Sequence, residues 1–300
     1  MTRPPRVLIT GGTGLLGRYL LETAPEEVQV AATFHRNPPP QEGSGRFQPL
    51  DVRDGEAVEQ LFRQLRPEWV IHTASVGSVD EAQRDPARVR AINVEGTRAV
   101  GEACLRHGSR LLYISSNAVF DGKHPPYKEE DPLCPLNRYG ELKAEAEQWV
   151  RRSLPEALIL RPILMYGWPL EGGRENAVTR WLKALEKGTP VQVSEQTVSM
   201  PLWAADCARA VWTGLLRNKR GILHVGGADR VTMHEFAREV CRCFGQDELL
   251  LRPLPDGAFT HLAPRPKDTS FDLTRLRREF GIEPLGVREG LAQMRLQLVP

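Results

Sequence analysis

Two side chains with paired acid–base chemistry lie one helical turn apart near the middle of the chain. Tyr139 and Lys143 form a Tyr-x-x-x-Lys motif in a predicted helix, so both side chains share one helix face. An ammonium beside a phenol favours the phenolate, and we therefore expect Lys143 to lower the pKa of Tyr139 toward neutrality. Tyr139 can then act as a general acid for a substrate carbonyl during reduction, or as a base in the reverse direction. On its own, the motif more often marks two surface side chains.

Two hydroxyl groups end a predicted strand upstream of this motif. Ser115 and Ser116 close the apolar run 110–116. Ligands of a parallel sheet bind at the carboxyl ends of its strands, so a hydroxyl there can hydrogen-bond the same carbonyl oxygen as Tyr139. Combined with these serines and with a glycine-rich turn near the N-terminus, the Tyr-x-x-x-Lys motif becomes a specific signal for a catalytic pair.

The glycine-rich turn spans residues 10–17, between a short apolar strand and a predicted helix. Glycines at this spacing allow a tight turn at Gly11, close approach of a pyrophosphate at Gly14 and close packing of helix on strand at Gly17. The helix N-terminus then directs free N–H groups at the phosphates. We assign six residues of the turn to dinucleotide binding: Gly11, Thr13, Gly14, Leu15, Leu16 and Gly17.

The end of the second predicted strand favours NADP over NAD, with NAD kept as the alternative. NAD-binding sheets of this kind place an Asp or Glu there, but no acid occurs from residue 28 to residue 40. Arg36 can instead pair with a 2′-phosphate, with His35 nearby and Arg18 as a second candidate. Two further residues, after the next extended segment, are expected near the adenine: Asp51 and Val52.

Short apolar runs alternate with helical stretches up to about residue 165, as in right-handed βαβ units. The runs are almost uninterrupted, which is typical of strands buried on both faces. Strands are predicted at 6–10, 28–34, 69–74, 110–116 and 157–161, and helices at 15–23, 55–65, 86–107 and 137–152. We therefore predict an α/β fold, with a doubly wound parallel Rossmann sheet in residues 1–165 that binds NAD(P).

The pattern changes after residue 165, which predicts a smaller, irregular substrate-binding lobe over residues 166–300. We expect the chain to return to the first domain at about residues 200–225. Helices are expected at 172–187, 204–216, 233–244, 274–280 and 287–298, extended segments at 191–200 and 221–225, and a Pro-rich stretch at 252–266.

Composition excludes several classes of protein. The net charge of +2 at pH 7 gives no reason to expect nucleic acid or a membrane surface as a partner. The N-terminus has no signal-type apolar run and no stretch reaches the length of a membrane span, which predicts a cytoplasmic protein. The cysteines show no metal-ligand spacing, so we expect no metal and reduced thiols. His72 and His224 lie in apolar strands and are expected to be hydrogen-bonded core histidines.

Three segments around the Tyr-x-x-x-Lys motif, at residues 115–122, 126–131 and 135–140, resemble the extended short-chain dehydrogenase/reductases. Within them, the chain is similar to the dTDP-4-dehydrorhamnose reductase family, and residues 265–272 resemble the Arg-Pro signature near the end of that family. The likeness covers nearly the whole chain and is strongest from residue 114 to residue 143. The same superfamily contains the NADP-binding regulatory β subunit of methionine adenosyltransferase.

The resemblance implies a catalytic set of Ser116, Tyr139 and Lys143, with Ser115 as the alternative to Ser116. The implied reaction is hydride transfer from NADPH to a 4-keto group on a nucleotide-linked deoxysugar, with Tyr139 protonating the oxygen. The residues that the resemblance adds to the cofactor site are Ala74, Ser75, Asn93, Tyr139, Lys143 and Ile163.

The chain departs from the reductases where they contact substrate. Asn117 and Ala118 replace an Asp and a Tyr, and Leu164 stands where several reductases carry a Trp that stacks on the nucleotide base. Trp168 is then the nearest aromatic candidate for that stacking. The predicted substrate-binding residues are Ser116, Asn117, Ala118 and Trp168.

Three functions follow from these residues. The first is an NADP(H)-dependent 4-ketoreductase acting on a nucleotide sugar. The second is an NADP-binding regulatory subunit with little turnover, because residues 161–167 look more like the regulatory subunits. The third is a sugar-nucleotide epimerase or dehydratase, although Asn117 and Ala118 lack the acid–base pair of a dehydratase. The intact Tyr–Lys pair favours an enzyme, and a homodimer is left open.

Overall fold

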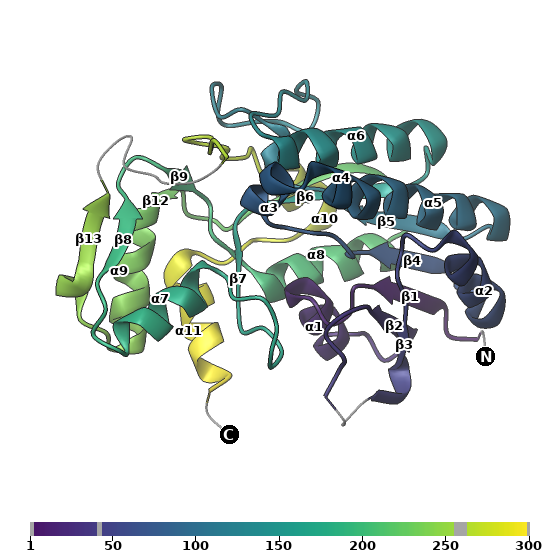
Figure 1. Cartoon of the computed structure of the whole chain (residues 1–300), viewed down its shortest axis with the longest axis horizontal. Helices are drawn as coiled ribbons and strands as arrows, with labels where there is room; N and C mark the ends of the chain where they lie inside the picture. Colours follow the sequence, from purple (N-terminus) through teal and green to yellow (C-terminus); the bar gives the residue numbers. More distant parts are fainter. Residues whose placement is uncertain (1–2, 41–43, 255–262, 299–300) are drawn as a thin grey trace.

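A seven-stranded parallel sheet forms the core of the larger part of the molecule, on the right in Figure 1. The computed structural model describes residues 3–40, 44–254 and 263–298. The strands lie in the order β11-β6-β5-β4-β1-β2-β3. Their bounds are Arg6–Thr10 (β1), Gln29–Phe34 (β2), Phe47–Pro49 (β3), Trp69–His72 (β4), Arg110–Ile114 (β5), Leu158–Pro162 (β6) and Gly221–Val225 (β11). The predicted α/β class with a doubly wound parallel sheet is confirmed.

Helices cover both faces of this sheet (Figure 1). Successive side chains of β1 point to opposite faces, so Val7 and Ile9 pack in one core and Leu8 packs in the other. One face carries α1 (Leu15–Glu22), α8 (Ala204–Leu216) and α10 (Thr274–Phe280). The other carries α2 (Gly55–Leu65), α3 (Val79–Arg84), α4 (Pro86–Arg90), α5 (Gly96–His107) and α6 (Arg138–Ser153).

The strand order changes direction at β1, because β2 and β3 lie on one side of it and β4, β5 and β6 on the other. Open parallel sheets bind ligands at such a switch point, outside the carboxyl ends of the strands. The loops after β1, β4 and β5 therefore meet at one edge, and they carry the glycine turn, residues 73–78 and the two serines.

Side chains at the N-termini fix where several helices begin. Asp54 accepts the N–H groups of Glu56 and Ala57 at the start of α2, and Asn137 accepts that of Gly140 at the start of α6. The helix predicted over 86–107 is interrupted, because residues Ala91–Glu95 form a π-helical segment between α4 and α5.

A smaller lobe contains three two-stranded sheets and a separate apolar core. The sheets pair β10 with β7 and β13 with β8 in parallel, and β12 with β9 antiparallel. The strands are Met165–Tyr166 (β7), Val191–Ser194 (β8), Val198–Ser199 (β9), Leu202–Trp203 (β10), Val231–Thr232 (β12) and Leu251–Leu254 (β13). The helices are Ala177–Leu185 (α7), Met233–Phe244 (α9) and Val287–Leu296 (α11).

The lobe differs from the sequence prediction in three places. The helix expected from residue 172 begins at Ala177, because Asn176 caps it. The extended segment 191–200 is split, because the Ser194 hydroxyl accepts the N–H groups of Gln196 and Thr197 in a turn. The Pro-rich stretch contributes strand β13 before residues 255–262, which lie outside the described residues.

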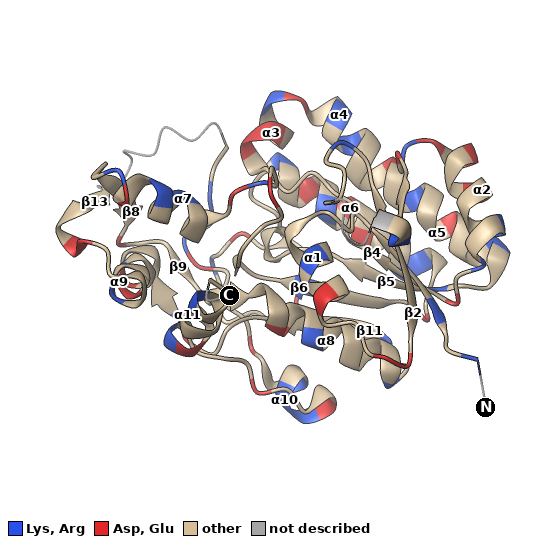
Figure 2. Ribbon diagram, turned by 90° about the horizontal axis from the view of Figure 1, so that it is seen from below, with Lys and Arg blue, Asp and Glu red and all other residues tan. Residues whose placement is uncertain are grey.

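Acidic and basic side chains are mixed over the helices that Figure 2 shows, in keeping with the net charge of +2. Within the described ranges, no helix combines the length and the apolar character needed to cross a bilayer. The five cysteines are all free thiols, and three of them are buried.

Candidate active site

The glycine turn after β1 has the geometry of a phosphate cradle. Gly11 adopts a left-handed conformation with φ +73°, which favours glycine. A Cβ on Gly17 would lie 2.5 Å from the carbonyl oxygen of Gly11, so only glycine lets α1 pack this closely on the turn. Gly14 precedes α1 and supplies no capping side chain, so the first N–H groups of the helix are left for a ligand. These features fit a dinucleotide pyrophosphate.

The end of β2 leaves an arginine free for an anionic ligand. Asp51 is already engaged, because Arg53 lies 2.5 Å and His35 lies 3.4 Å from its carboxylate. The Arg53 hydrogen bond lowers the pKa of Asp51 to about 2. Arg36 is exposed and has no ion-pair partner within the described part of the chain. Arg18, the second candidate for the 2′-phosphate, donates instead to Glu22 and to two backbone carbonyls of the lobe.

Tyr139 and Lys143 lie on the buried face of α6, at the edge where the sheet ends. Close packing holds this helix start in place: a Cβ on Gly140 would lie 2.1 Å from the carbonyl oxygen of Ala118. The Lys143 ammonium donates to the Ile114 carbonyl oxygen at 2.7 Å and stacks on the Tyr113 ring. The motif is therefore a buried pair and not two surface side chains.

The expected lowering of the pKa of Tyr139 by Lys143 is wrong in this structure. Burial raises the pKa of Tyr139, while Ser116 and Arg174 act in the opposite direction. Burial also lowers the pKa of Lys143 to about 7, against the attraction of Glu147. The physical reason is desolvation, which disfavours the charged form of each group.

The two adjacent serines have different neighbours. The Ser115 hydroxyl donates to Glu147 at 2.7 Å, inside the protein. The Ser116 hydroxyl accepts the N–H of Ala118 and lies against the Tyr139 phenol, whose pKa it lowers. The geometry therefore favours Ser116 over Ser115 as the partner of Tyr139, and the catalytic role of both stays a prediction.

Two asparagines brace the loops around the site. Asn93, in the π-helical segment, bonds both backbone groups of Val76 and so holds the loop that carries Ala74 and Ser75. Asn117 donates to the Thr269 hydroxyl at 2.6 Å, which ties the loop after β5 to the C-terminal segment.

Trp168 and Ile163 lie in different surroundings from each other. The indole N–H of Trp168 donates to the Met294 carbonyl, and its ring packs edge-on against Phe244. The predicted stacking of Trp168 on a substrate base stays a prediction, with the indole half-buried in the lobe. Ile163 follows β6 directly and is buried, with its N–H bonded to Val225.

A charged cluster behind the site was not foreseen from the sequence. Glu147 lies one turn after Lys143 and forms a fully buried ion pair with Arg161. Arg161 also lies 3.0 Å from His224, which contacts the Tyr127 carbonyl. His224 is thus the hydrogen-bonded core histidine that was predicted. The only sequence signal for the cluster was an arginine inside an apolar strand.

Arg174 is the other residue that the sequence analysis missed. It lies in the loop between β7 and α7 and interacts electrostatically with Tyr139. Its position 35 residues after Tyr139 gave no signal, because only the folded lobe brings the two together.

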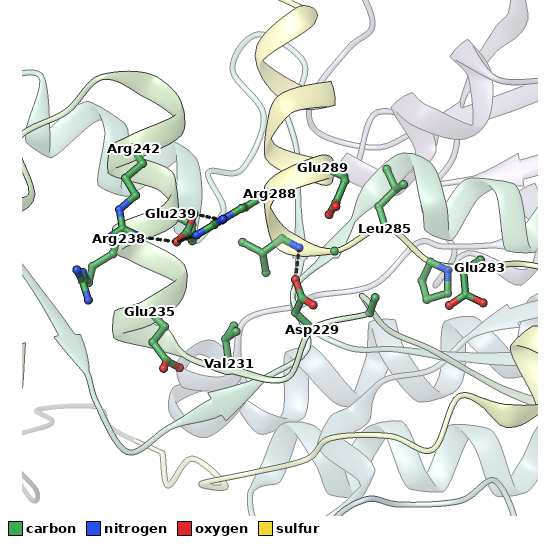
Figure 3. Close-up of a pocket in the computed structure, with 14 residues that line it drawn as sticks. Asp229, Val231, Glu235, Arg238, Glu239, Arg242, Glu283, Leu285, Arg288 and Glu289 are labelled. Atoms are coloured by element: carbon green, nitrogen blue, oxygen red, sulfur yellow. Dashed lines mark hydrogen bonds and ion pairs between the residues drawn. The ribbon is translucent and has the colours of Figure 1, made fainter.

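A cavity of about 720 Å³ in the lobe is separate from these residues (Figure 3). Its lining comes from α9, the start of α11 and the loops before them, and it carries five carboxylates and three guanidinium groups. One of the carboxylates, Glu239, bonds both Arg242 and Arg288. None of the predicted site residues lines it. Across the described ranges, no cluster of His, Cys, Asp and Glu could hold a metal.

Comparison with known proteins agrees with this geometry. The family described as "RmlD substrate binding domain" matches residues 5–299. A dTDP-4-dehydrorhamnose reductase of Streptomyces griseus is 32% identical over 288 residues, which cover 94% of this chain and 90% of the relative. Subunit beta of methionine adenosyltransferase 2 from Rattus norvegicus is 31% identical over 305 residues, covering 95% and 87%. The crystal structure of the Bacillus anthracis dTDP-4-dehydrorhamnose reductase in complex with NADP superimposes with a TM-score of 0.88 at 26% identity, covering 98% and 99%.

Proposed function

The chain belongs to the RmlD substrate-binding domain family, and on that premise we propose that it is an NADP(H)-dependent reductase of a 4-keto nucleotide-linked deoxysugar. The observation that carries the proposal is the position of Ser116, Tyr139 and Lys143. Both the serine-bearing loop and the start of α6 lie at the edge where the glycine turn offers its free N–H groups. A cofactor and a carbonyl substrate can therefore meet beside the Tyr139 phenol.

A nicotinamide cofactor, when bound at the glycine turn, would supply the hydride for reduction of the carbonyl carbon. Tyr139 donates its phenolic proton to the carbonyl oxygen, and the Ser116 hydroxyl holds that oxygen in place. The raised pKa of Tyr139 keeps the phenol protonated before the reaction, as a general acid requires. Lys143, with its pKa near 7, exchanges protons readily at neutral pH.

The choice of NADP over NAD as the cofactor rests on the charged side chains near the end of β2. Arg36 offers a guanidinium there that has no ion-pair partner among the residues that the structure describes, and the carboxylate of Asp51 is engaged with Arg53 and His35. A 2′-phosphate forms strong bidentate contacts with a guanidinium. The NADP named in the Bacillus anthracis structure is consistent with this choice.

The test is oxidation of NADPH by the purified protein with dTDP-4-dehydro-L-rhamnose as substrate. Replacement of Tyr139 by Phe should lower turnover about 100-fold or more, because the proton donor is lost. Tyr113→Phe is the matched control, because it removes another buried phenolic hydroxyl, one without a hydrogen-bond partner among the described residues. Turnover that survives in Tyr139→Phe contradicts the assigned role.

A regulatory subunit with little turnover is the second candidate, and its support is the 31% identity to subunit beta of methionine adenosyltransferase 2. In that case the protein binds NADPH tightly and oxidises none of it with any 4-keto nucleotide sugar. Binding without turnover in the same assay therefore selects this alternative.

A further inference from the structure

The loop between β7 and α7, residues 167–176, is held at its base by hydrogen bonds to α1, to α11 and within the loop itself. The Asn176 side chain closes it by donating to the Gly167 carbonyl at 2.6 Å. Arg18 donates to the carbonyls of Trp168 and Pro169 at 2.9 and 3.1 Å. The Trp168 indole is fixed on α11 through Met294. The loop base is therefore fixed both to α1, below the glycine turn, and to the lobe.

Arg174 extends from this loop back to the edge of the sheet. Its Nη1 lies 3.0 Å from the position that a Cβ on Gly77 would occupy, so the guanidinium contacts the loop after β4. That loop also carries Ala74 and Ser75. The mutual electrostatic effect of Arg174 and Tyr139 places the same guanidinium within range of the phenol.

Arg174 has neither a hydrogen bond nor an ion pair among the described residues, and it is exposed at this edge. The carboxylate of the neighbouring Glu175 forms an ion pair with the Lys183 ammonium, at 2.7 Å. The guanidinium therefore keeps its donors free beside the loop after β4, and an anionic oxygen there would accept strong charge-assisted hydrogen bonds from it.

We propose that Arg174 determines substrate specificity by binding an anionic oxygen of the substrate while the carbonyl group lies against Tyr139. The inference rests on the proposed function, since it places a substrate carbonyl at Tyr139. Two groups can supply the oxygen, the diphosphate of the nucleotide or a carboxylate on the sugar. Arg174 makes no hydrogen bond to Tyr139, so the bound anion lies apart from the reacting carbonyl oxygen.

The experiment is equilibrium binding to the protein loaded with NADPH, which requires no turnover. The probes are dTDP, dTDP-glucose, UDP-glucose and UDP-glucuronate, measured with the wild-type protein, Arg174→Ala and Arg174→Lys. The control is Arg180→Ala, which removes the same charge from an exposed position on α7. Affinity for NADPH should be unchanged in all variants.

If the diphosphate is the ligand, Arg174→Ala weakens dTDP and dTDP-glucose alike by about tenfold or more, and Arg174→Lys weakens them less. If a sugar carboxylate is the ligand, only UDP-glucuronate loses affinity relative to UDP-glucose. The loss should also shrink with added salt, because it is electrostatic. Gly77→Ala, which displaces the guanidinium by its new methyl group, should give a smaller loss of the same kind.

The proposal fails if Arg174→Ala binds all four probes as the wild-type protein and Arg180→Ala do, or if the wild-type protein binds none of them. Failure of the proposed reductase function gives a different result. In that case the probes bind in an Arg174-dependent manner, but no 4-keto nucleotide sugar is reduced.

Discussion

The Glu147 carboxylate lies 2.6 Å from the Arg161 guanidinium, and neither side chain has any exposed surface. Glu147 also accepts the hydroxyl proton of Ser115 at 2.7 Å. Because Glu147 belongs to α6, Arg161 to β6 and Ser115 to the end of β5, this cluster joins the helix that carries Tyr139 to two strands of the sheet. It fixes the position of the helix from inside the protein.

Breaking this ion pair should destabilise the protein strongly. Glu147→Gln leaves the buried charge of Arg161 without its partner, which costs about 3–5 kcal/mol in the free energy of unfolding. The measurement is urea denaturation followed by circular dichroism. Glu141→Gln, on the exposed side of the same helix and paired with Arg138, should cost less than about 1 kcal/mol. Equal losses in the two variants contradict a special role for the buried pair.

Replacement of Gly17 by Ala should abolish tight NADPH binding. The new methyl group would lie 2.5 and 2.6 Å from the carbonyl oxygens of Gly11 and Gly12, so α1 has to move away from the turn. Fluorescence titration with NADPH measures the effect. Gly55→Ala is the control, because a Cβ there meets no atom within 4 Å. Normal NADPH affinity in Gly17→Ala would show that cofactor binding does not depend on the close packing of α1 on the glycine turn.

Arg36→Ala should weaken NADPH binding by about tenfold or more and leave NADH binding unchanged, because only NADPH carries the 2′-phosphate. Both affinities are measured by the same titration. Arg278→Ala, an exposed position on α10, controls for the loss of one positive charge. A wild-type protein that prefers NADH, or an equal effect on both cofactors, excludes Arg36 as the selecting residue.

Stability should fall as the pH falls below about 6.5, partly through His72. Burial lowers the pKa of His72 from 6.5 to about 3, so the unfolded chain takes up a proton that the folded protein refuses. The contribution is fully present above pH 6.5 and is lost as the pH falls toward 3. His72→Gln should therefore show a flatter dependence of the unfolding free energy on pH between these values than the wild-type protein. His124→Gln, at an exposed position, should keep the wild-type slope.

The sheet and the position of the catalytic helix could be predicted from the sequence, because local patterns determine them. Uninterrupted apolar runs marked the five strands predicted up to residue 165, and Asn137 before the Tyr-x-x-x-Lys motif marked the start of α6. The spacing of Tyr139 and Lys143 was enough to place both on one helix face. These features depend on neighbours only a few residues apart.

The direction of the pKa shift of Tyr139 could not be predicted in the same way. It depends on how much water the folded protein removes, and on Arg174 from a distant loop. The hydrogen bond of the Trp168 indole could not be predicted either, because its partner Met294 lies 126 residues further along the chain. The end of the strand within the extended segment 191–200 could not be predicted, because it depends on a turn in which the Ser194 hydroxyl accepts two backbone N–H groups.

Gly140 limits how far the sequence of this helix can diverge. A Cβ there would lie 2.1 Å from the Ala118 carbonyl oxygen, and the backbone on both sides is held, by Asn137 in the helix and by Ser116 in the loop. Any descendant that keeps Tyr139 beside Ser116 must therefore keep glycine next to the tyrosine. In a search among diverged sequences, a side chain at this position is a sign that the active-site geometry has been lost, even where the tyrosine and lysine remain.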